Sequence, residues 1–320
     1  MRIAVTGSTG FVGSNIVTVL SNVGHDVVGL IRKPQSMPWE TREVDFSAEE
    51  SLVKQMHDCQ VVVHCAIAND FNRLMQDRPF AYDAFVGMTS RVVRAANQVG
   101  AKPIYISTDW VMDGTSHLVI ESDPGNPLNI YGYLKALGEQ VVRDLAPSNG
   151  AICRIGGVMG VHQTKAEGPR NQDVGFGYFV TSLVKALQAN QSFAVWSGDR
   201  VNNIATPSLA SEIGAQIDRI VSLDESGTFH LVGDDAIDRF GLAMMAARIF
   251  HLPSDLILQT EPPESELFPA AVPVDTSLDN RLTKKKLKLG PTSLNDLLIA
   301  LRRELETGTL APITTHLPRA

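Results

Sequence analysis

The sequence has few cysteines and no long apolar run. Its three cysteines, Cys59, Cys65 and Cys153, are widely spaced and fit neither a disulfide framework nor a metal motif, so we expect a reducing, cytoplasmic setting and no metal. No apolar stretch approaches the roughly 20 residues that span a bilayer. Glycine, serine and threonine interrupt the apolar N-terminus early, so we expect neither a signal peptide nor a membrane partner.

The sequence also has no excess of positive charge. The formal net charge is -7, which argues against a general binder of nucleic acid or of anionic membranes. With 320 residues, of which 44% are hydrophobic, the chain can bury a sizeable core in one large or two modest domains.

The N-terminal segment predicts a phosphate-binding turn. The short apolar strand Ile3-Ala4-Val5 leads directly into Gly-Ser-Thr-Gly-Phe-Val-Gly at residues 7–13, and apolar residues then recur at helical spacing. Glycines let a backbone approach a pyrophosphate, and a helix N-terminus attracts its charge. The expected cofactor contacts here are Gly7, Thr9, Gly10, Phe11, Val12 and Gly13.

The end of the second predicted strand indicates which dinucleotide binds. An NAD site would place an acid about 20 residues beyond the glycines, to bind the ribose 2′-hydroxyl. This chain has Arg32 there, followed by Lys33. Two cations favour a 2′-phosphate and hence NADP(H), although a solvated basic strand end would give the same pattern.

Two later strand ends add candidate cofactor contacts. Asp45, near the end of a third predicted strand, could reach the adenine amine or could cap the next helix. Cys65 and Ala66 follow the strand that begins at Val61, and their small side chains would let a cofactor pass over the sheet edge.

The segment from Ile104 to Glu139 contains the strongest catalytic pattern. An apolar strand ends at Thr108, and a helix begins near Tyr131 with Lys135 four residues later on the same face. An ammonium beside a phenol favours phenolate and lowers the phenol pKa. Such a tyrosine can protonate a carbonyl oxygen, and the Thr108 hydroxyl can hold that oxygen. A Tyr and a Lys at this spacing can equally be a surface pair.

Candidate substrate contacts are Thr108, Asp109, Trp110 and Arg154. Arg154 ends a buried strand and could be either an ion-pair partner or a substrate anchor. The polar, glycine-rich segment 160–177 carries His162, Lys165 and Arg170, which suit an anionic substrate group or a solvated loop equally well.

The order of elements predicts an α/β fold. Strands and helices alternate through the first 160 residues, which predicts a Rossmann-type, doubly wound, mostly parallel sheet. Shorter elements follow and indicate a smaller C-terminal substrate-binding α/β lobe. We expect the dinucleotide domain to comprise residues 1–160 and about 200–224, and the lobe about 161–199 and 225–306. Residues 307–320 would form a tail.

Over nearly its full length the chain resembles the extended short-chain dehydrogenase/reductase family. The markers are GSTGFVG, ISTDWVMDG at residues 106–114 and NPLNIYGYLKALGE at residues 126–139. The last two are most similar to the dTDP-4-dehydrorhamnose reductase branch. The resemblance implies that Thr108 is the catalytic hydroxyl, Tyr131 the acid and Lys135 the lysine that lowers the Tyr pKa and bonds the nicotinamide ribose. It further implies NADPH-dependent reduction of a nucleotide-linked keto-sugar, and it is compatible with a homodimer.

The sequence departs from the family pattern at two places; one related function is excluded and two others remain open. Phe85 stands where the family often has Asn, and the loop at 160–177 is longer than usual for this branch. A 4,6-dehydratase would need a Glu after Asp109, but Trp110 is there. A nucleotide-sugar epimerase would keep Thr, Tyr and Lys but tends to hold NAD, against which Arg32 argues. The branch also resembles the NADP-binding, non-catalytic regulatory subunit of methionine adenosyltransferase.

Overall fold

A computed structural model describes residues 1–68, 70–164 and 175–314. A seven-stranded sheet with strand order β11-β6-β5-β4-β1-β2-β3 organises the molecule, and every strand pair in it is parallel. Its strands are β1 (Arg2–Thr6), β2 (Asp26–Ile31), β3 (Glu40–Glu43), β4 (Val61–His64), β5 (Lys102–Thr108), β6 (Ala151–Ile155) and β11 (Gly227–His230). The predicted Rossmann-type α/β fold is confirmed.

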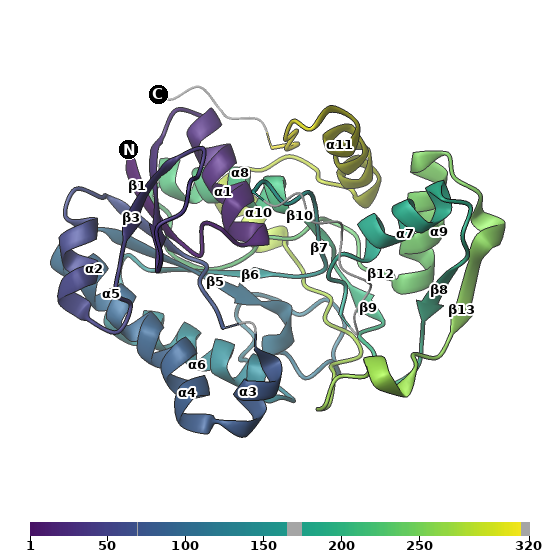
Figure 1. The fold of residues 1–320 in the computed structure, drawn as a ribbon, viewed down its shortest axis with the longest axis horizontal. Coiled ribbons are helices and arrows are strands. Elements are labelled where there is room, and N and C mark those ends of the chain that lie inside the picture. Colours follow the sequence, from purple (N-terminus) through teal and green to yellow (C-terminus); the bar gives the residue numbers. More distant parts are fainter. Residues whose placement is uncertain (69, 165–174, 315–320) are drawn as a thin grey trace.

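Helices cover both faces of this sheet, as Figure 1 shows. On one face lie α1 (Phe11–Asn22) and α8 (Ala210–Ser222), and on the other lie α2 (Glu49–Met56), α5 (Met88–Gln98) and α6 (Ile130–Leu145). Because both faces are covered, the central strands are continuous apolar runs rather than alternating ones. The segment before α5 consists of α3 (Phe71–Gln76), α4 (Arg78–Tyr82) and a π-helical turn at Asp83–Gly87.

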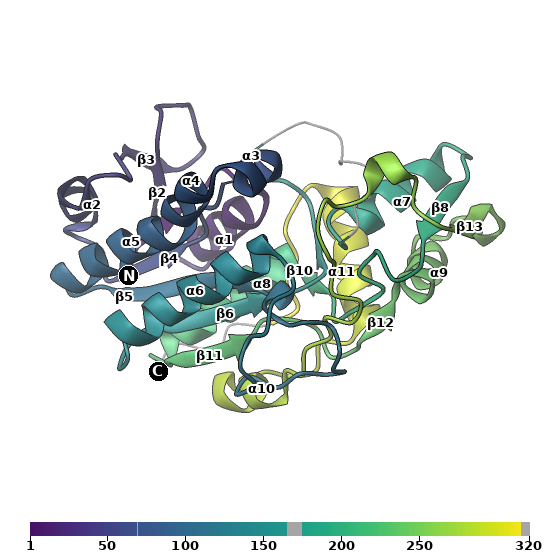
Figure 2. The same ribbon diagram turned by 90° about the horizontal axis from the view of Figure 1, so that it is seen from below.

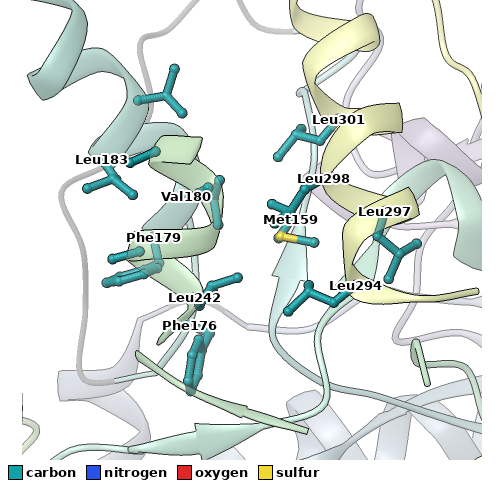
Figure 3. Packing of buried hydrophobic residues seen from close by; sticks show 14 of the residues in the cluster. Met159, Phe176, Phe179, Val180, Leu183, Leu242, Leu294, Leu297, Leu298 and Leu301 are labelled. Carbon is teal, nitrogen blue, oxygen red and sulfur yellow. The ribbon is translucent and has the colours of Figure 1, made fainter. Parts of the chain in front are cut away.

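The smaller C-terminal lobe packs three helices around its own apolar core (Figure 3). These helices are α7 (Phe179–Gln188), α9 (Arg239–Phe250) and α11 (Leu294–Thr307). Strands β8 (Phe193–Trp196) and β13 (Ile257–Thr260) pair in parallel at its outer edge. Short pairs join β7 (Val158–Met159) to β10 (Ser208–Leu209), and β9 (Ile204–Ala205) to β12 (Ile237–Asp238). Figure 2 shows this lobe beyond one end of the main sheet.

The expected division of the chain needs one correction. The sequence predicts that residues 225–306 belong to the lobe, but β11 pairs with β6 and forms the last strand of the main sheet. Helix α10 (Arg281–Leu287) also packs on β11 and α8. The sequence misleads here because a four-residue strand is too short to indicate which sheet it joins.

The first part of the tail docks on two buried carboxylates. The Ala311 amide donates to Glu304 at 2.9 Å, and the amides of Ile313 and Thr314 donate to Glu212 at 2.7 and 3.0 Å. Residues after 314 lie outside the described part of the chain. Within that part, no helix has the length and apolar character required to cross a membrane.

Candidate functional site

A cavity of about 790 Å³ lies at the carboxyl ends of the central strands, between the sheet and the C-terminal lobe. Its walls include the glycine turn after β1, the ends of β5 and β6, the start of α6, and lobe residues around Phe176 and Phe268. Open α/β folds bind their ligands in this region, outside the carboxyl ends of the strands.

The glycine turn is built for close backbone approach. Gly7 has a φ of +67°, and a Cβ there would lie 2.8 Å from the Ala66 amide nitrogen. A Cβ on Gly13 would overlap the Gly7 carbonyl. Gly10 caps α1, whose first turn contains no acidic residue. The turn and the helix N-terminus therefore offer an anion both space and a favourable dipole.

Most of the predicted cofactor residues line this cavity. They are Gly7, Thr9, Gly10, Phe11, Val12, Gly13, Cys65, Tyr131 and Lys135. Ala66 is not among the lining residues, but its backbone lies close to Gly7. The Thr6 hydroxyl accepts hydrogen bonds from the amides of Cys65 and Ala66, each at 3.2 Å.

The three remaining predicted cofactor contacts lie away from the cavity wall. Arg32 and Lys33 are exposed just beyond β2, and it is Gln35, Ser36 and Met37 of the same loop that line the cavity. Asp45 accepts hydrogen bonds from the amide and hydroxyl of Ser47, at 2.8 and 2.6 Å. Its carboxylate therefore organises the turn before α2. It does not cap that helix, because the N-cap residue is Ala48 and no side chain caps it.

Thr108, Tyr131 and Lys135 come together on one wall of the cavity. Thr108 ends β5 and its hydroxyl hydrogen-bonds the Tyr131 side chain. The Tyr131 ring makes T-shaped contacts with the rings of Phe85 and Trp110, each with its centroid 6.1 Å away. These two contacts restrict the direction of the phenol.

Hydrogen bonds of Asn129 connect the start of α6 to the C-terminal lobe. The Asn129 side chain caps the helix by accepting a hydrogen bond from the Gly132 amide at 3.0 Å. Its own amide group donates to the Ala271 carbonyl at 2.9 Å. This cap places the first turn of α6, which carries Tyr131, relative to both parts of the molecule.

Burial is the largest influence on the pKa values of Tyr131 and Lys135. It raises the pKa of Tyr131 to about 12, although the Thr108 hydrogen bond opposes the rise. It also lowers the pKa of Lys135 to about 8. The Lys135 ammonium donates to the Ile106 carbonyl and lies 4.3 Å from the centre of the Tyr105 ring. The expected lowering of the Tyr131 pKa by Lys135 is therefore wrong for this structure, since the desolvation of a buried phenolate prevails.

Asp109 connects this wall to the C-terminal lobe. It is 4% exposed and borders the cavity. It accepts hydrogen bonds from Thr108 at 3.0 Å and from Thr276 at 2.6 Å. Burial raises its pKa to about 6, although these hydrogen bonds oppose the rise.

Arg154 is an ion-pair partner and not a substrate anchor. Its side chain has 0% exposure, and its Nε and Nη2 atoms each lie 2.9 Å from an oxygen of Glu139. A substrate could reach this guanidinium only by breaking the ion pair, so we correct the interpretation that placed it in the site.

Sequence reasoning missed several side chains of the cavity wall, chiefly Asn202, Tyr178 and Phe268. The Tyr178 ring lies 5.0 Å from that of Phe11 and so joins α7 to the glycine turn. The Phe268 ring lies 5.7 Å from that of Trp110. The only usable signal was Gly156-Gly157 directly after β6, where two small residues at a strand end leave room beside the cavity. Lys165 and Arg170 lie outside the described residues.

A family model described as "RmlD substrate binding domain" matches residues 1–304. The chain belongs to this family, which lies within the extended short-chain dehydrogenases/reductases and comprises NAD(P)-dependent sugar reductases together with relatives that are not enzymes.

Among individual relatives, the chain is 28% identical over 302 residues to a probable low-salt glycan biosynthesis reductase from Haloferax volcanii, covering 93% of this chain and 96% of that protein. It is 27% identical to subunit beta of methionine adenosyltransferase 2 from Rattus norvegicus, covering 79% and 73%. The fold matches that of a dTDP-4-dehydrorhamnose reductase from Bacillus anthracis solved with NADP, with a TM-score of 0.78, 21% identity and coverage of 95% and 99%.

Proposed function

We propose that this protein reduces a nucleotide-linked keto-sugar with NADPH, in the manner of dTDP-4-dehydrorhamnose reductases, and that Tyr131 is the proton donor. One observation carries the proposal: Thr108, Tyr131 and Lys135 line the same cavity as the glycine turn. Membership of the sugar-reductase family adds support.

The residues present fit the cofactor. The glycine turn and the N-terminus of α1 suit a pyrophosphate, and the small side chain of Cys65 leaves room beside it. Lys135, a buried residue of the cavity lining, would bond a ribose hydroxyl. Arg32 and Lys33 follow β2 and would meet a 2′-phosphate after a change of side-chain rotamer, which exposed cations make readily.

In the proposed reaction the chain positions a carbonyl and protonates it. When bound, NADPH supplies a hydride to the carbonyl carbon. The Thr108 hydroxyl and the Tyr131 phenol bind the carbonyl oxygen, and Tyr131 gives that oxygen its proton. The contacts with Phe85 and Trp110 restrict the orientation of the Tyr131 ring, so the phenol needs to move little when it transfers its proton.

The substrate end of the cavity suits a sugar. Trp110 and Phe268 meet edge to face there, and Asn202 adds a polar group to the same wall. Aromatic faces pack on the apolar C–H surface of sugars, while an amide fixes their hydroxyls.

We place the protein in the cytoplasm, in line with the free state of its three cysteines. A homodimer is compatible with the family.

A second function has a specific observation in its favour, namely the similarity to the methionine adenosyltransferase subunit. A protein of that kind would bind NADP without turning it over. A nucleotide-sugar epimerase is a third possibility, against which the cations after β2 argue. The intact set of Thr108, Tyr131 and Lys135 favours an enzyme over the regulatory subunit.

The test follows NADPH oxidation with a panel of nucleotide-linked 4-keto-6-deoxy sugars, including dTDP-4-keto-6-deoxy-D-glucose. We expect turnover with at least one member, and a fall in kcat of about 100-fold or more in Tyr131→Phe with NADPH affinity retained. Tight NADPH binding without turnover across the panel would favour the regulatory function. Conversion of a nucleotide sugar with a C4 hydroxyl to its 4-epimer would favour the epimerase.

A further inference from the structure

A chain of hydrogen bonds leads from Tyr131 into the interface between the two parts of the molecule. The Tyr131 phenol bonds the Thr108 hydroxyl, which donates to Asp109 Oδ1 at 3.0 Å, and Asp109 Oδ2 accepts from Thr276 at 2.6 Å. We propose that Asp109 is a proton store that restores the proton of Tyr131 through the Thr108 hydroxyl after each reduction. The inference rests on the proposed reductase function and adds a residue to it.

When Asp109 is ionised, the hydrogen bonds that link it to Thr108 and Tyr131 permit only one assignment of donors and acceptors. A threonine hydroxyl has one hydrogen to donate, and Thr108 gives it to the carboxylate. The Thr108 oxygen accepts from the Trp110 amide at 3.3 Å, and while its hydrogen is donated to the carboxylate it can only accept from the Tyr131 phenol. Tyr131 is protonated in this arrangement, which is the state that follows a completed transfer. When the phenol ionises, the Thr108 hydrogen can turn to the phenolate, and it is this bond that lowers the pKa of Tyr131.

The transfer itself conserves atoms and charge. Once Tyr131 has given its proton to the carbonyl oxygen, it is a phenolate. The O–H bond of protonated Asp109 breaks as a new one forms on Thr108, and the original Thr108 hydrogen moves to the Tyr131 oxygen. The phenolate becomes a phenol, the carboxyl becomes a carboxylate, and no electrons change hands. Asp109 borders the cavity, so a proton from the bulk solvent can reach it again through water that enters after product release.

Burial gives this transfer its direction. The raised pKa of Tyr131 makes its phenolate a much stronger base than the Asp109 carboxylate. The proton therefore moves from Asp109 to Tyr131 and not the reverse. The raised pKa of Asp109, about 6, also means that a fraction of molecules carries the proton near neutral pH.

The surroundings of Asp109 leave its charge without a cationic partner among the described contacts. The titratable group that faces it is the Tyr131 phenol on α6. The loop after β6 contributes the Gly156 backbone, where a Cβ would lie 2.8 Å from Asp109 Oδ2. The lobe contributes the Thr276 hydroxyl, which is itself 3.2 Å from Asn202 Oδ1. A carboxylate that served only to hold the two parts together would not need to border the cavity or to bond Thr108.

The test measures kcat and KM between pH 5 and 9 with NADPH and dTDP-4-keto-6-deoxy-D-glucose. We expect the wild-type kcat to fall as pH rises through about 6, because the store empties. Asp109→Asn keeps the shape but cannot titrate, and should lower kcat about 100-fold at pH 6 with KM within about three-fold, and abolish that limb of the profile. Thr276→Val removes one hydrogen bond to the carboxylate and should move the limb to higher pH.

Each of the following outcomes would overturn either the proton store or the reductase function. An Asp109→Asn enzyme that retains the wild-type limb, or that raises KM with kcat unchanged, overturns the proposal. If this variant does not fold, Thr276→Val decides, and an unmoved limb overturns the proposal. A wild-type protein without turnover across the whole panel refutes the reductase function itself, whereas an active wild type with an unaffected Asp109→Asn variant refutes the proton store alone.

Discussion

Arg154 and Glu139 form a fully buried ion pair that ties β6 to α6 beneath the cavity. Burial alone would raise the pKa of Glu139, but the hydrogen bonds and charge of Arg154 outweigh it and hold that pKa below its ordinary value. The Ser107 hydroxyl, at the end of β5, donates to the same carboxylate at 2.6 Å. The pair thus supports the strand and the helix that carry Thr108 and Tyr131.

Replacing Arg154 alone should be strongly destabilising. Arg154→Met leaves the Glu139 carboxylate buried, with the partly exposed Arg143 as its remaining ion-pair partner among the described residues. We expect the free energy of unfolding to fall by about 3–5 kcal/mol. Urea unfolding measures this. The double variant Arg154→Met with Glu139→Gln should recover part of the loss, because no buried charge is then left. A single variant as stable as wild type would contradict the buried pair.

Arg32→Ala should weaken NADPH binding far more than NADH binding. A charge-assisted hydrogen bond to a 2′-phosphate contributes about 1.5–3 kcal/mol, which corresponds to a loss of about 10- to 100-fold in affinity. Fluorescence titration with both cofactors measures the ratio, and Lys33→Ala, at the adjacent exposed cation, is the matched variant. Equal losses for NADPH and NADH would mean that the cation does not contact the 2′-phosphate.

Gly7→Ala should abolish dinucleotide binding, and Gly24→Ala provides its control. Both glycines have positive φ values, +67° and +87°, so alanine should cost about 1–2 kcal/mol of backbone strain at either position. Only at Gly7 would the new Cβ also overlap a neighbour, the Ala66 backbone, whereas nothing lies within 4 Å at Gly24. Titration with NADPH should therefore show binding in Gly24→Ala alone. Normal binding by Gly7→Ala would mean that the turn has room for a side chain.

Acidification should destabilise the protein through His64. This buried ring bonds Thr6 at 2.7 Å and Thr89 at 3.1 Å, and burial lowers its pKa from 6.5 to about 3. Between these two values the unfolded chain binds a proton that the folded chain does not, so stability rises with pH in that window. From pH 6.5 down to 5 the loss is about 2 kcal/mol from this group.

The matched variant is His64→Gln, which can accept from one threonine and donate to the other but does not titrate. The difference in unfolding free energy between pH 7 and pH 5 should be about 2 kcal/mol smaller in the variant than in the wild type. Urea unfolding at both pH values supplies the comparison. An identical pH dependence in the two proteins would show that His64 is protonated in the folded state.

Local sequence was sufficient for the α/β fold and for the wall that carries Thr108, Tyr131 and Lys135. The glycine turn follows a short apolar strand directly, and the Tyr and Lys lie one helical turn apart. Both patterns are local, because the period of a helix and the position of a strand end fix where such side chains point. The place of β11 was not predictable, since four residues do not show which sheet they join.

The sequence did not predict which residues far apart in the chain come into contact. Arg154 could have been an anchor or an ion-pair partner, and only the position of Glu139 on α6 decides between them. The contact between Thr276 and Asp109 spans 167 residues, and no local period encodes it. The pKa of Tyr131 was predicted in the wrong direction, because a neighbouring ammonium is visible in the sequence but the depth of burial is not.

The amino-acid sequence by itself determined the parallel sheet, the glycine turn and the spacing of Tyr131 and Lys135, since these depend on interactions between near neighbours. Tertiary structure alone decided which charges are buried, which carboxylate borders the cavity and how strongly the phenol holds its proton. Those properties depend on how much water and which partners surround a group once the chain has packed.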